Sequence, residues 1–419
     1  MRPASSRFLL TGFLLTGFFA GCAEIPGKPS QIIAQSDVEP LIPDPFSPGP
    51  LRYPYRPVKP SRATAKPKPT GVAEKTSSRP AQDNVQAAVR RLLPSGVNDR
   101  EGWARDIANA FLSLRVNPSV DNLCAVLAVT EQESSFQADP PVAGLPGIVR
   151  GEIAKRRERY HIPEPVVRLA LAVTSPDGCA YEQRIDALRT ENDLNRLYAD
   201  MISELPLGKR LLADYNPVRT GGPMQVSLKF AQTRVRETPY PYPYPIKTTL
   251  RDELFTRRGG LYFGMAYLLG YPASYPEMIY RFADYNAGRY ASRNAAFQAA
   301  VGQLSGVEMD RDGDLLRYRD GEIDDQPSQT LQTVLALAPR LQLSREAILR
   351  DLRKEKSAEF ERTAVFARVF ALAQASGRET PQARLPDIRL DSPKITSGLT
   401  TSKFAQRVNR RYENCLNRR

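Results

Sequence analysis

The sequence is poor in the side chains on which much enzyme chemistry depends. Its 419 residues include one histidine, His161, and only four cysteines. With a single histidine we do not expect a Ser-His-Asp triad, and a histidine-rich zinc site or an HExxH helix, which need more than one histidine, are excluded. If the chain is an enzyme, carboxylates or hydroxyls must carry the reaction, and we expect no metal ion and no other cofactor.

Proline and positive charge are, by contrast, in excess. The chain has 36 prolines, and 59 lysines and arginines against 46 acids give a net charge of +13. Hydrophobic residues make up 41% of the chain, which is enough to build a core. The positive charge indicates an anionic partner such as nucleic acid, an acidic polymer or a lipid surface. We do not expect nucleic acid, because the sequence has no Walker loop, zinc finger or convincing RNA-binding signature.

The N-terminus has the pattern of an export signal. Arg2 and Arg7 precede an apolar run over residues 8–19, and Ala20-Gly21-Cys22 follows. This predicts a signal peptide over residues 1–21 that is too short for an ordinary membrane-spanning helix. Its end resembles the bacterial lipobox, which implies a lipid on Cys22, although an ordinary signal peptide with a coincidental cysteine would look the same. The absence of aspartate after Cys22 then favours an anchor in the outer membrane of a Gram-negative bacterium, facing the periplasm.

A proline-rich tether is expected next, over residues 22–84. Residues 23–80 contain 13 prolines and few large apolar side chains, so this stretch cannot bury enough surface to fold. Loss of the signal peptide lowers the net charge by two, to +11. The tether would let a globular part leave the membrane surface.

Helical periodicity begins at about Val85, and strand-like alternation is scarce, so we predict an all-α fold. Three cysteines remain after Cys22, namely Cys124, Cys179 and Cys415, and they allow one disulfide. A bond from Cys124 to Cys179 is a guess, and burial of Cys124 as a free thiol is the alternative. Helices are expected at Trp103–Val116, Asn122–Phe136, Asn192–Leu205, Gly260–Leu269, Leu331–Leu337, Ser344–Lys356 and Glu359–Gln374.

One of these helices carries the candidate acid. In the segment from Asn122 to Phe136, Leu123, Val126 and Leu127 form a buried stripe, and Glu133 extends its apolar edge near the C-terminal end. Apolar neighbours and the helix dipole there favour the protonated carboxyl group, as a general acid requires. A solvated surface glutamate is the alternative for a single such residue. Glu131 points to another side and is the better surface candidate.

Two later segments are each weak signals alone. The segment Gly221-Gly222-Pro223-Met224-Gln225 permits close approach of its backbone, but two glycines usually mark a turn. The segment Asp284-Tyr285-Asn286-Ala287-Gly288 ends a helix, and a glycine there is usually a C-cap.

Taken in order, the segments resemble the three signatures of the Slt-type lytic transglycosylases, which share the goose-lysozyme fold. That family has Glu-Ser-x-Phe, Gly-Leu-Met-Gln and Ala-Tyr-Asn-Ala-Gly. This chain has Glu133-Ser134-Ser135-Phe136, Gly222-Pro223-Met224-Gln225 and Asp284-Tyr285-Asn286-Ala287-Gly288. The resemblance covers roughly residues 105–300, and within it the chain is most similar to an uncharacterised group of proteobacterial lipoproteins.

The resemblance implies a domain organisation with clear departures from the family. We expect a lysozyme-like domain over residues 85–325 with a helical insertion at about 137–218, because 92 positions separate Glu133 from Gln225. A C-terminal helical extension covers residues 326–419. Pro223 stands where the family has leucine, and Asp284 stands where it has alanine.

By the same resemblance, the function would be cleavage of peptidoglycan glycan strands by a membrane-anchored lytic transglycosylase. Glu133 would protonate the bond between N-acetylmuramic acid and N-acetylglucosamine and then act as base, leaving a 1,6-anhydro end. Ser134, Met224, Gln225, Tyr285 and Asn286 would bind the substrate or shape the cleft. The alternative is an inactive scaffold lipoprotein that binds peptidoglycan.

Three further segments have competing interpretations. The run from Thr238 to Pro245 alternates tyrosine with proline, and predicts either a sugar-stacking rim or a stiff connection packed on the domain. The acids from Asp310 to Asp314 suggest calcium, but an EF-hand needs glycine and glutamate where Leu315 and Gly321 stand, so a charged turn is expected. The basic tail from Ser402 is expected to be a solvated helix.

Overall fold

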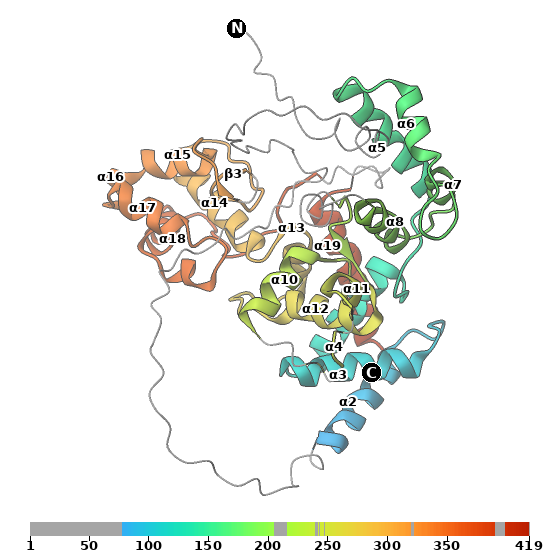
Figure 1. The fold of residues 1–419 in the computed structure, drawn as a ribbon. Coiled ribbons are helices and arrows are strands. Elements are labelled where there is room, and N and C mark those ends of the chain that lie inside the picture. Colours follow the sequence, from blue (N-terminus) through green and yellow to red (C-terminus); the bar gives the residue numbers. More distant parts are fainter. Residues whose placement is uncertain are drawn as a thin grey trace, which may run out of the picture. The chain divides into compact units, whose positions relative to one another are not determined.

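The computed structural model describes residues 78–204, 216–238, 242, 244–246, 248–319, 322–389 and 399–418 (Figure 1). The predicted signal peptide, Cys22 and the tether as far as residue 77 lie outside these residues. The first described helix, α2, already begins at Ser78, inside the range predicted for the tether.

The described residues are mostly helical, which confirms the all-α prediction. Their strands are two residues long, and β3 pairs with β4 antiparallel, with Tyr318 opposite Ile323. None of the described helices is long and apolar enough to span a membrane. The helices are α2 (Ser78–Leu92), α3 (Arg100–Leu114), α4 (Val120–Ser134), α5 (Leu145–Arg159), α6 (Glu164–Leu171), α7 (Tyr181–Asp186), α8 (Glu191–Ser203), α10 (Leu228–Glu237), α11 (Leu250–Phe255), α12 (Arg257–Leu269), α13 (Met278–Ala287), α14 (Ala291–Ser305), α15 (Gln329–Ala336), α16 (Ala338–Leu341), α17 (Arg345–Leu352), the 3₁₀ helix η2 (Ala358–Arg362), α18 (Ala364–Ala375) and α19 (Thr401–Leu416), and the strands are β1 (Thr220–Gly221), β2 (Val226–Ser227), β3 (Tyr318–Arg319) and β4 (Glu322–Ile323).

The described chain separates into two compact units. The smaller unit contains residues 139–204 and 216–221, with helices α5 to α8 (green in Figure 1). Its core is small, and Leu145, Tyr181, Ile185, Leu188 and Leu197 form its buried centre. The larger unit contains the remaining described residues, and every segment that matched a sequence motif lies in it.

The first core of the larger unit surrounds α4. Residues 123–130 of this helix are all buried, so α4 is covered on every side and not only along the predicted stripe. Helices α2, α3, α12, α13 and α19 contribute to the same hydrophobic cluster. A helix enclosed in this way fixes the position of the residues at its ends, Glu133 among them.

Three helix boundaries differ from the predictions because caps decide them. The side chain of Asp99 accepts a hydrogen bond from the Gly102 N–H, so α3 begins three residues before Trp103. Helix α4 ends at Ser134, two residues before the predicted end at Phe136, because Ser135 and Phe136 both have positive φ, 50° and 59°. Thr363 caps α18, so that helix begins after the residues that were predicted to start it.

The last helix, α19, is fastened to α4 by a disulfide. Cys124 of α4 pairs with Cys415 of α19, and Cys179 is an exposed free thiol. The guess that Cys124 pairs with Cys179 is therefore wrong. The ring of Tyr412 also packs edge-on against Phe282 of α13, with 5.7 Å between centroids. The end of the expected C-terminal extension is thus part of the first core.

A second core of the larger unit is built on α14, α15, α17 and α18 around Phe297, Phe360, Phe366 and Phe370. It contains a buried carboxyl group, Glu355, which accepts hydrogen bonds from the Leu315 N–H and the Tyr318 hydroxyl. Burial, and after it the charge of Asp314, raises the pKa of Glu355 to about 8. Lys356 lies 3.4 Å from Asp314 and opposes that shift.

We expect the disulfide to stabilise the larger unit, because it joins residues 291 positions apart and so restricts the unfolded chain. Replacing Cys124 and Cys415 together by alanine should lower the free energy of unfolding by about 2–5 kcal/mol, measured by urea unfolding. The matched control is Cys179→Ala, which alters an exposed thiol. Equal stability of the double variant and the control would contradict this role.

The raised pKa of Glu355 predicts a pH dependence of stability. The folded protein holds a proton on this group that the unfolded chain, with a carboxyl pKa near 4.5, has lost. The stabilisation from the bound proton is complete below the unfolded-state pKa of 4.5. It is lost as the pH rises toward about 8, where Glu355 ionises in the folded protein too. Unfolding free energies measured at about pH 5 and about pH 8 should differ by on the order of 2 kcal/mol. Glu355→Gln should remove most of this difference, with a smaller part left to Asp314, whose pKa burial raises to about 6, whereas Glu359→Gln, at an exposed position, should keep it.

Candidate functional site

Three segments that are distant in the sequence meet in the larger unit at Tyr285. Its hydroxyl, near the end of α13, donates a 2.6 Å hydrogen bond to the Met224 carbonyl oxygen. Burial, and after it the negative charge of Glu133, raises the pKa of Tyr285 well above its usual range. The phenol therefore stays protonated at neutral pH, bound to the loop of residues 222–225, which we call the glycine loop, and within the electrostatic influence of Glu133 near the end of α4.

The glycine loop packs closely against α12. Gly222 has a φ of 76°, and a Cβ atom on it would collide with the Leu254 carbonyl. A Cβ atom on Gly264, in the middle of α12, would collide with the side chain of Met224. Met224 is completely buried, so it contributes to the site through its carbonyl oxygen and not by contact with a ligand.

Gln225 is the member of the glycine loop that reaches toward solvent. It is half-buried and has a φ of 49°, a left-handed conformation that is uncommon outside glycine. Its side-chain Nε2 donates to the Gly222 carbonyl at 3.3 Å, which closes the loop on itself. The positive φ turns the backbone sharply between the glycine loop and β2.

Two neighbouring side chains at the end of α4 have different environments. Glu133 is half-buried, whereas Ser134 is buried and its hydroxyl donates to the Thr130 carbonyl at 2.9 Å. The Ser134 hydroxyl thus donates to its own helix and is not directed at a substrate. Glu131 lies 3.7 Å from the guanidinium group of Arg411 on α19, so it is paired and not simply a surface acid.

Asp284 has a structural role that the sequence did not reveal. It is completely buried, and its carboxyl group accepts hydrogen bonds from the Tyr271 hydroxyl at 2.9 Å, the Tyr290 N–H at 3.0 Å and the Ser292 N–H at 2.7 Å. The Tyr275 hydroxyl is a fourth donor. Burial raises the pKa of Asp284, and these donors oppose the rise. The alanine-to-aspartate departure therefore fixes the turn between α13 and α14, directly beside Tyr285.

Asn286, the last candidate, is held by a residue that the sequence reasoning missed. Its side-chain oxygen accepts a 2.8 Å hydrogen bond from the hydroxyl of Thr401, the first residue of α19. Thr401 is fully buried. No local motif pointed to this threonine, because it follows Asn286 by 115 positions and only the fold brings the two together.

In the remaining candidate segments, Tyr242 and Asp312 are held by contacts within the fold, whereas Tyr244 is exposed. Tyr242 is buried and its hydroxyl donates to the Asp106 carbonyl at 3.4 Å, so it packs on the domain and not on a sugar-stacking rim. Residues 239–241 and 243 lie outside the described residues. Asp312 accepts from Gln298 at 2.7 Å, which ties the acidic turn to α14. Across the described ranges, no group of three or more histidine, cysteine or acidic side chains is arranged to hold a metal ion.

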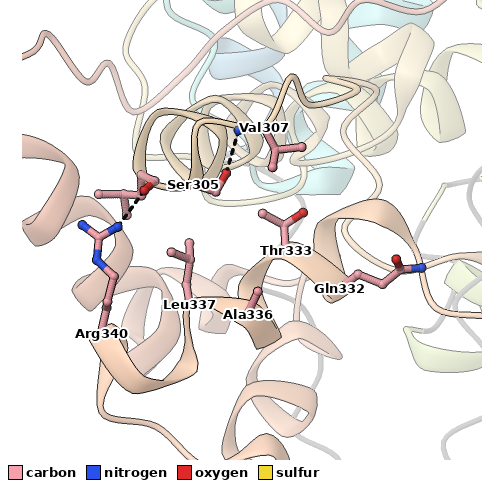
Figure 2. Close-up of a pocket in the computed structure, with 8 residues that line it drawn as sticks. Ser305, Val307, Gln332, Thr333, Ala336, Leu337 and Arg340 are labelled. Atoms are coloured by element: carbon pink, nitrogen blue, oxygen red, sulfur yellow. Dashed lines mark hydrogen bonds between the residues drawn. The ribbon is translucent and has the colours of Figure 1, made fainter.

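A pocket lies away from these residues, at the end of α14. It has a volume of about 420 Å³, and Figure 2 shows Thr333 and Leu337 pointing from α15 toward the end of α14. The guanidinium group of Arg340 at its edge donates to the Leu304 carbonyl at 2.7 Å. None of the candidate site residues lines this pocket. Its lining consists of Leu304, Ser305, Val307, Gln332, Thr333, Ala336, Leu337 and Arg340.

Comparison with known proteins places the chain in a family. Residues 96–418 match the family described as "Protein of unknown function (DUF1615)", and the chain belongs to it. It is 47% identical over 334 residues to the Escherichia coli (strain K12) protein named "Uncharacterized protein YaiW", in an alignment that covers 80% of this chain and 90% of that protein. No solved structure matches the chain.

These findings correct the family assignment made from the motifs. The assignment to the Slt-type lytic transglycosylases is wrong, because the family that matches nearly the whole globular part is a different one. Short motifs of three to five residues containing glycine, serine and asparagine recur in unrelated chains because turns and caps select the same residues. In this chain, all three motifs end a helix or form a tight loop.

The buried carboxyl group of Asp284 should be essential for stability. Asp284→Ala would leave two tyrosine hydroxyls and two backbone N–H groups without their acceptor, and should lower the free energy of unfolding by about 3 kcal/mol or more. Urea unfolding measures this loss. The control, Asp325→Ala, changes an exposed acid and should alter stability by less than about 0.5 kcal/mol. A comparable effect of both variants would show that the Asp284 bonds do not hold the α13–α14 turn.

Proposed function

We propose that the protein cleaves the glycan strands of peptidoglycan by lytic transglycosylation, with Glu133 as the acid and base. One observation carries the proposal: a half-buried glutamate at the end of an enclosed helix acts electrostatically on a protonated tyrosine that holds the glycine loop. The proposal includes a lysozyme-like arrangement of α4, the glycine loop and α13 around the scissile bond. It concerns the reaction and not membership of a lytic transglycosylase family.

The neighbouring acids favour a route with one carboxyl group. Asp284 is sealed from solvent by four donors, and Glu131 is paired with Arg411, so neither is suited to contact a glycan as a second carboxylate. Glycosidases that use water normally place two carboxyl groups across the bond. A single acid fits a reaction in which the nucleophile belongs to the substrate, because an intramolecular hydroxyl is already in position.

Glu133 ends this route with the same number of protons with which it began. Glu133 donates a proton to the glycosidic oxygen as the bond from that oxygen to C1 of N-acetylmuramic acid breaks. The C6 hydroxyl of the same sugar then forms a bond to C1, and its proton returns to Glu133. The products are a free hydroxyl on N-acetylglucosamine and a 1,6-anhydro end, and the phenol of Tyr285 keeps its hydrogen bond to the Met224 carbonyl.

The predicted signal peptide and tether also indicate where in the cell the protein acts. We place the protein at the outer membrane, facing the periplasm, with a lipid on Cys22 and the tether giving reach. The net charge of +11 that remains after removal of the signal peptide suits a partner that bears carboxylates, such as the peptide stems of peptidoglycan.

A binding protein without activity is the second candidate, and two observations favour it. Ser134 bonds to its own helix and Met224 is fully buried, so two of the expected substrate-binding side chains do not face a ligand. Such a protein would keep affinity for glycan strands and release nothing from them.

Digestion of purified sacculi separates the two candidates. The full chain should release muropeptides with 1,6-anhydro ends, read by mass spectrometry, and Glu133→Gln should release at least about a hundredfold less, because it lacks the transferable proton. Glu131→Gln, two positions away on the same helix, is the matched control and should remain active. No anhydro products from the unaltered chain, together with cosedimentation with sacculi, would support the binding candidate instead. Equal release by Glu133→Gln would exclude this glutamate as the acid.

A further inference from the structure

Helix α19 links the two helices that carry the candidate site. Near its C-terminal end, Cys415 is bonded to Cys124 of α4, and the Tyr412 hydroxyl donates to Asp121 of the same helix at 2.8 Å. At its first residue, Thr401 donates to Asn286 of α13. The helix therefore spans from the element that carries Glu133 to the element that carries Tyr285 and Asn286.

Thr401 is held firmly enough to orient its partner. It is fully buried, its N–H donates to the Ile388 carbonyl at 3.0 Å, and Thr400 before it caps α19 by accepting from the Lys403 N–H. A β-branched side chain in the first turn of a helix has few rotamers. The Thr401 hydroxyl is thus a donor in a fixed position, and it donates its hydrogen bond to the side-chain oxygen of Asn286.

The orientation of Asn286 decides which chemistry it offers. A side-chain amide has one acceptor oxygen and two N–H donors at opposite corners. The oxygen accepts from Thr401, and the hydrogen bond that holds this half-buried side chain within the described residues uses the oxygen and not the nitrogen. Asn286 can therefore present N–H donors to a ligand but not its carbonyl group.

We infer that Thr401 is a positioning residue of the proposed site, which turns the amide of Asn286 so that it donates to an oxygen of the glycan. This inference rests on the proposed function. The acetamido carbonyl groups and hydroxyls that line a glycan strand supply such acceptor oxygens. The disulfide between α19 and α4 holds the helix that begins with Thr401 at a fixed position relative to the helix that carries Glu133.

The test uses the full chain and four variants. Thr401→Val keeps the shape and removes the hydroxyl, and Thr401→Ser restores it. Asn286→Asp keeps the acceptor for Thr401 but replaces the donor nitrogen with an oxygen, and Thr333→Val removes a comparable buried hydroxyl on α15, which donates to the Gln329 carbonyl at 2.9 Å. Each variant is assayed for binding of soluble, uncrosslinked glycan strands and for release of anhydro ends.

We expect Thr401→Val and Asn286→Asp to lower the affinity for glycan strands by about tenfold, the effect of one lost hydrogen bond to a ligand. Thr401→Ser and Thr333→Val should stay within about twofold of the unaltered chain. Unchanged affinity of Asn286→Asp would overturn the inference, because the donor would then be unnecessary. An equal loss in Thr333→Val would also overturn it, since the effect would then be one of general stability.

A second measurement is independent of activity. The side-chain amide signals of Asn286, assigned by their absence in Asn286→Asp, should shift in the ¹H–¹⁵N spectrum of Thr401→Val and return in Thr401→Ser. Unshifted signals in Thr401→Val would overturn the positioning role. If the unaltered chain binds glycan strands but releases no anhydro ends, the proposed reaction fails while these binding and spectral comparisons still test Thr401.

Discussion

The larger unit depends on a single buried carboxyl group. Asp284 lies where α13 ends and α14 begins, and its four donors come from Tyr271, Tyr275 and the backbone of the first residues around α14. Helix α13 belongs to the first core and α14 to the second, so this group fixes the joint between the two. Tyr285 and Asn286 are the next two residues along the chain, so the bonds that join the cores also fix the helix end that carries them.

The sequence predicted elements better than it predicted relations between elements. Helical periodicity identified α3, α4, α12 and α18 because one-sided apolar spacing is a local property. The caps at Asp99, Thr363 and Ser135 shifted the boundaries, since a cap depends on one side chain or one φ value and not on periodicity. The disulfide was missed for a different reason: three cysteines allow three pairings, and only the packing of α19 on α4 selects one.

The candidate site shows the same division. The sequence identified Glu133, Tyr285 and the glycine loop, and the structure brings them together. It assigned contact roles to Ser134 and Met224, whose burial depends on the neighbours of α4 and α12. It had no means of finding Thr401, and it treated Asp284 as a defect. In both cases the decisive contacts cross between helices that no spacing rule connects. The family name suggested by the motifs failed because turns and helix ends produce similar short strings in many chains.

The link between Cys124 and Cys415 has a consequence for synthesis. The ribosome completes α4 long before α19, with 291 positions between the two cysteines. At the usual elongation rates of about 5–20 residues per second, the face of α4 that α19 covers waits roughly 15 to 60 s for its partner. During that interval the nascent chain leaves uncovered the apolar face of α4 on which α19 later packs. The bond between Cys124 and Cys415 can form only after α19 has been made, so the first core is closed by one of the last segments of the chain to be synthesised.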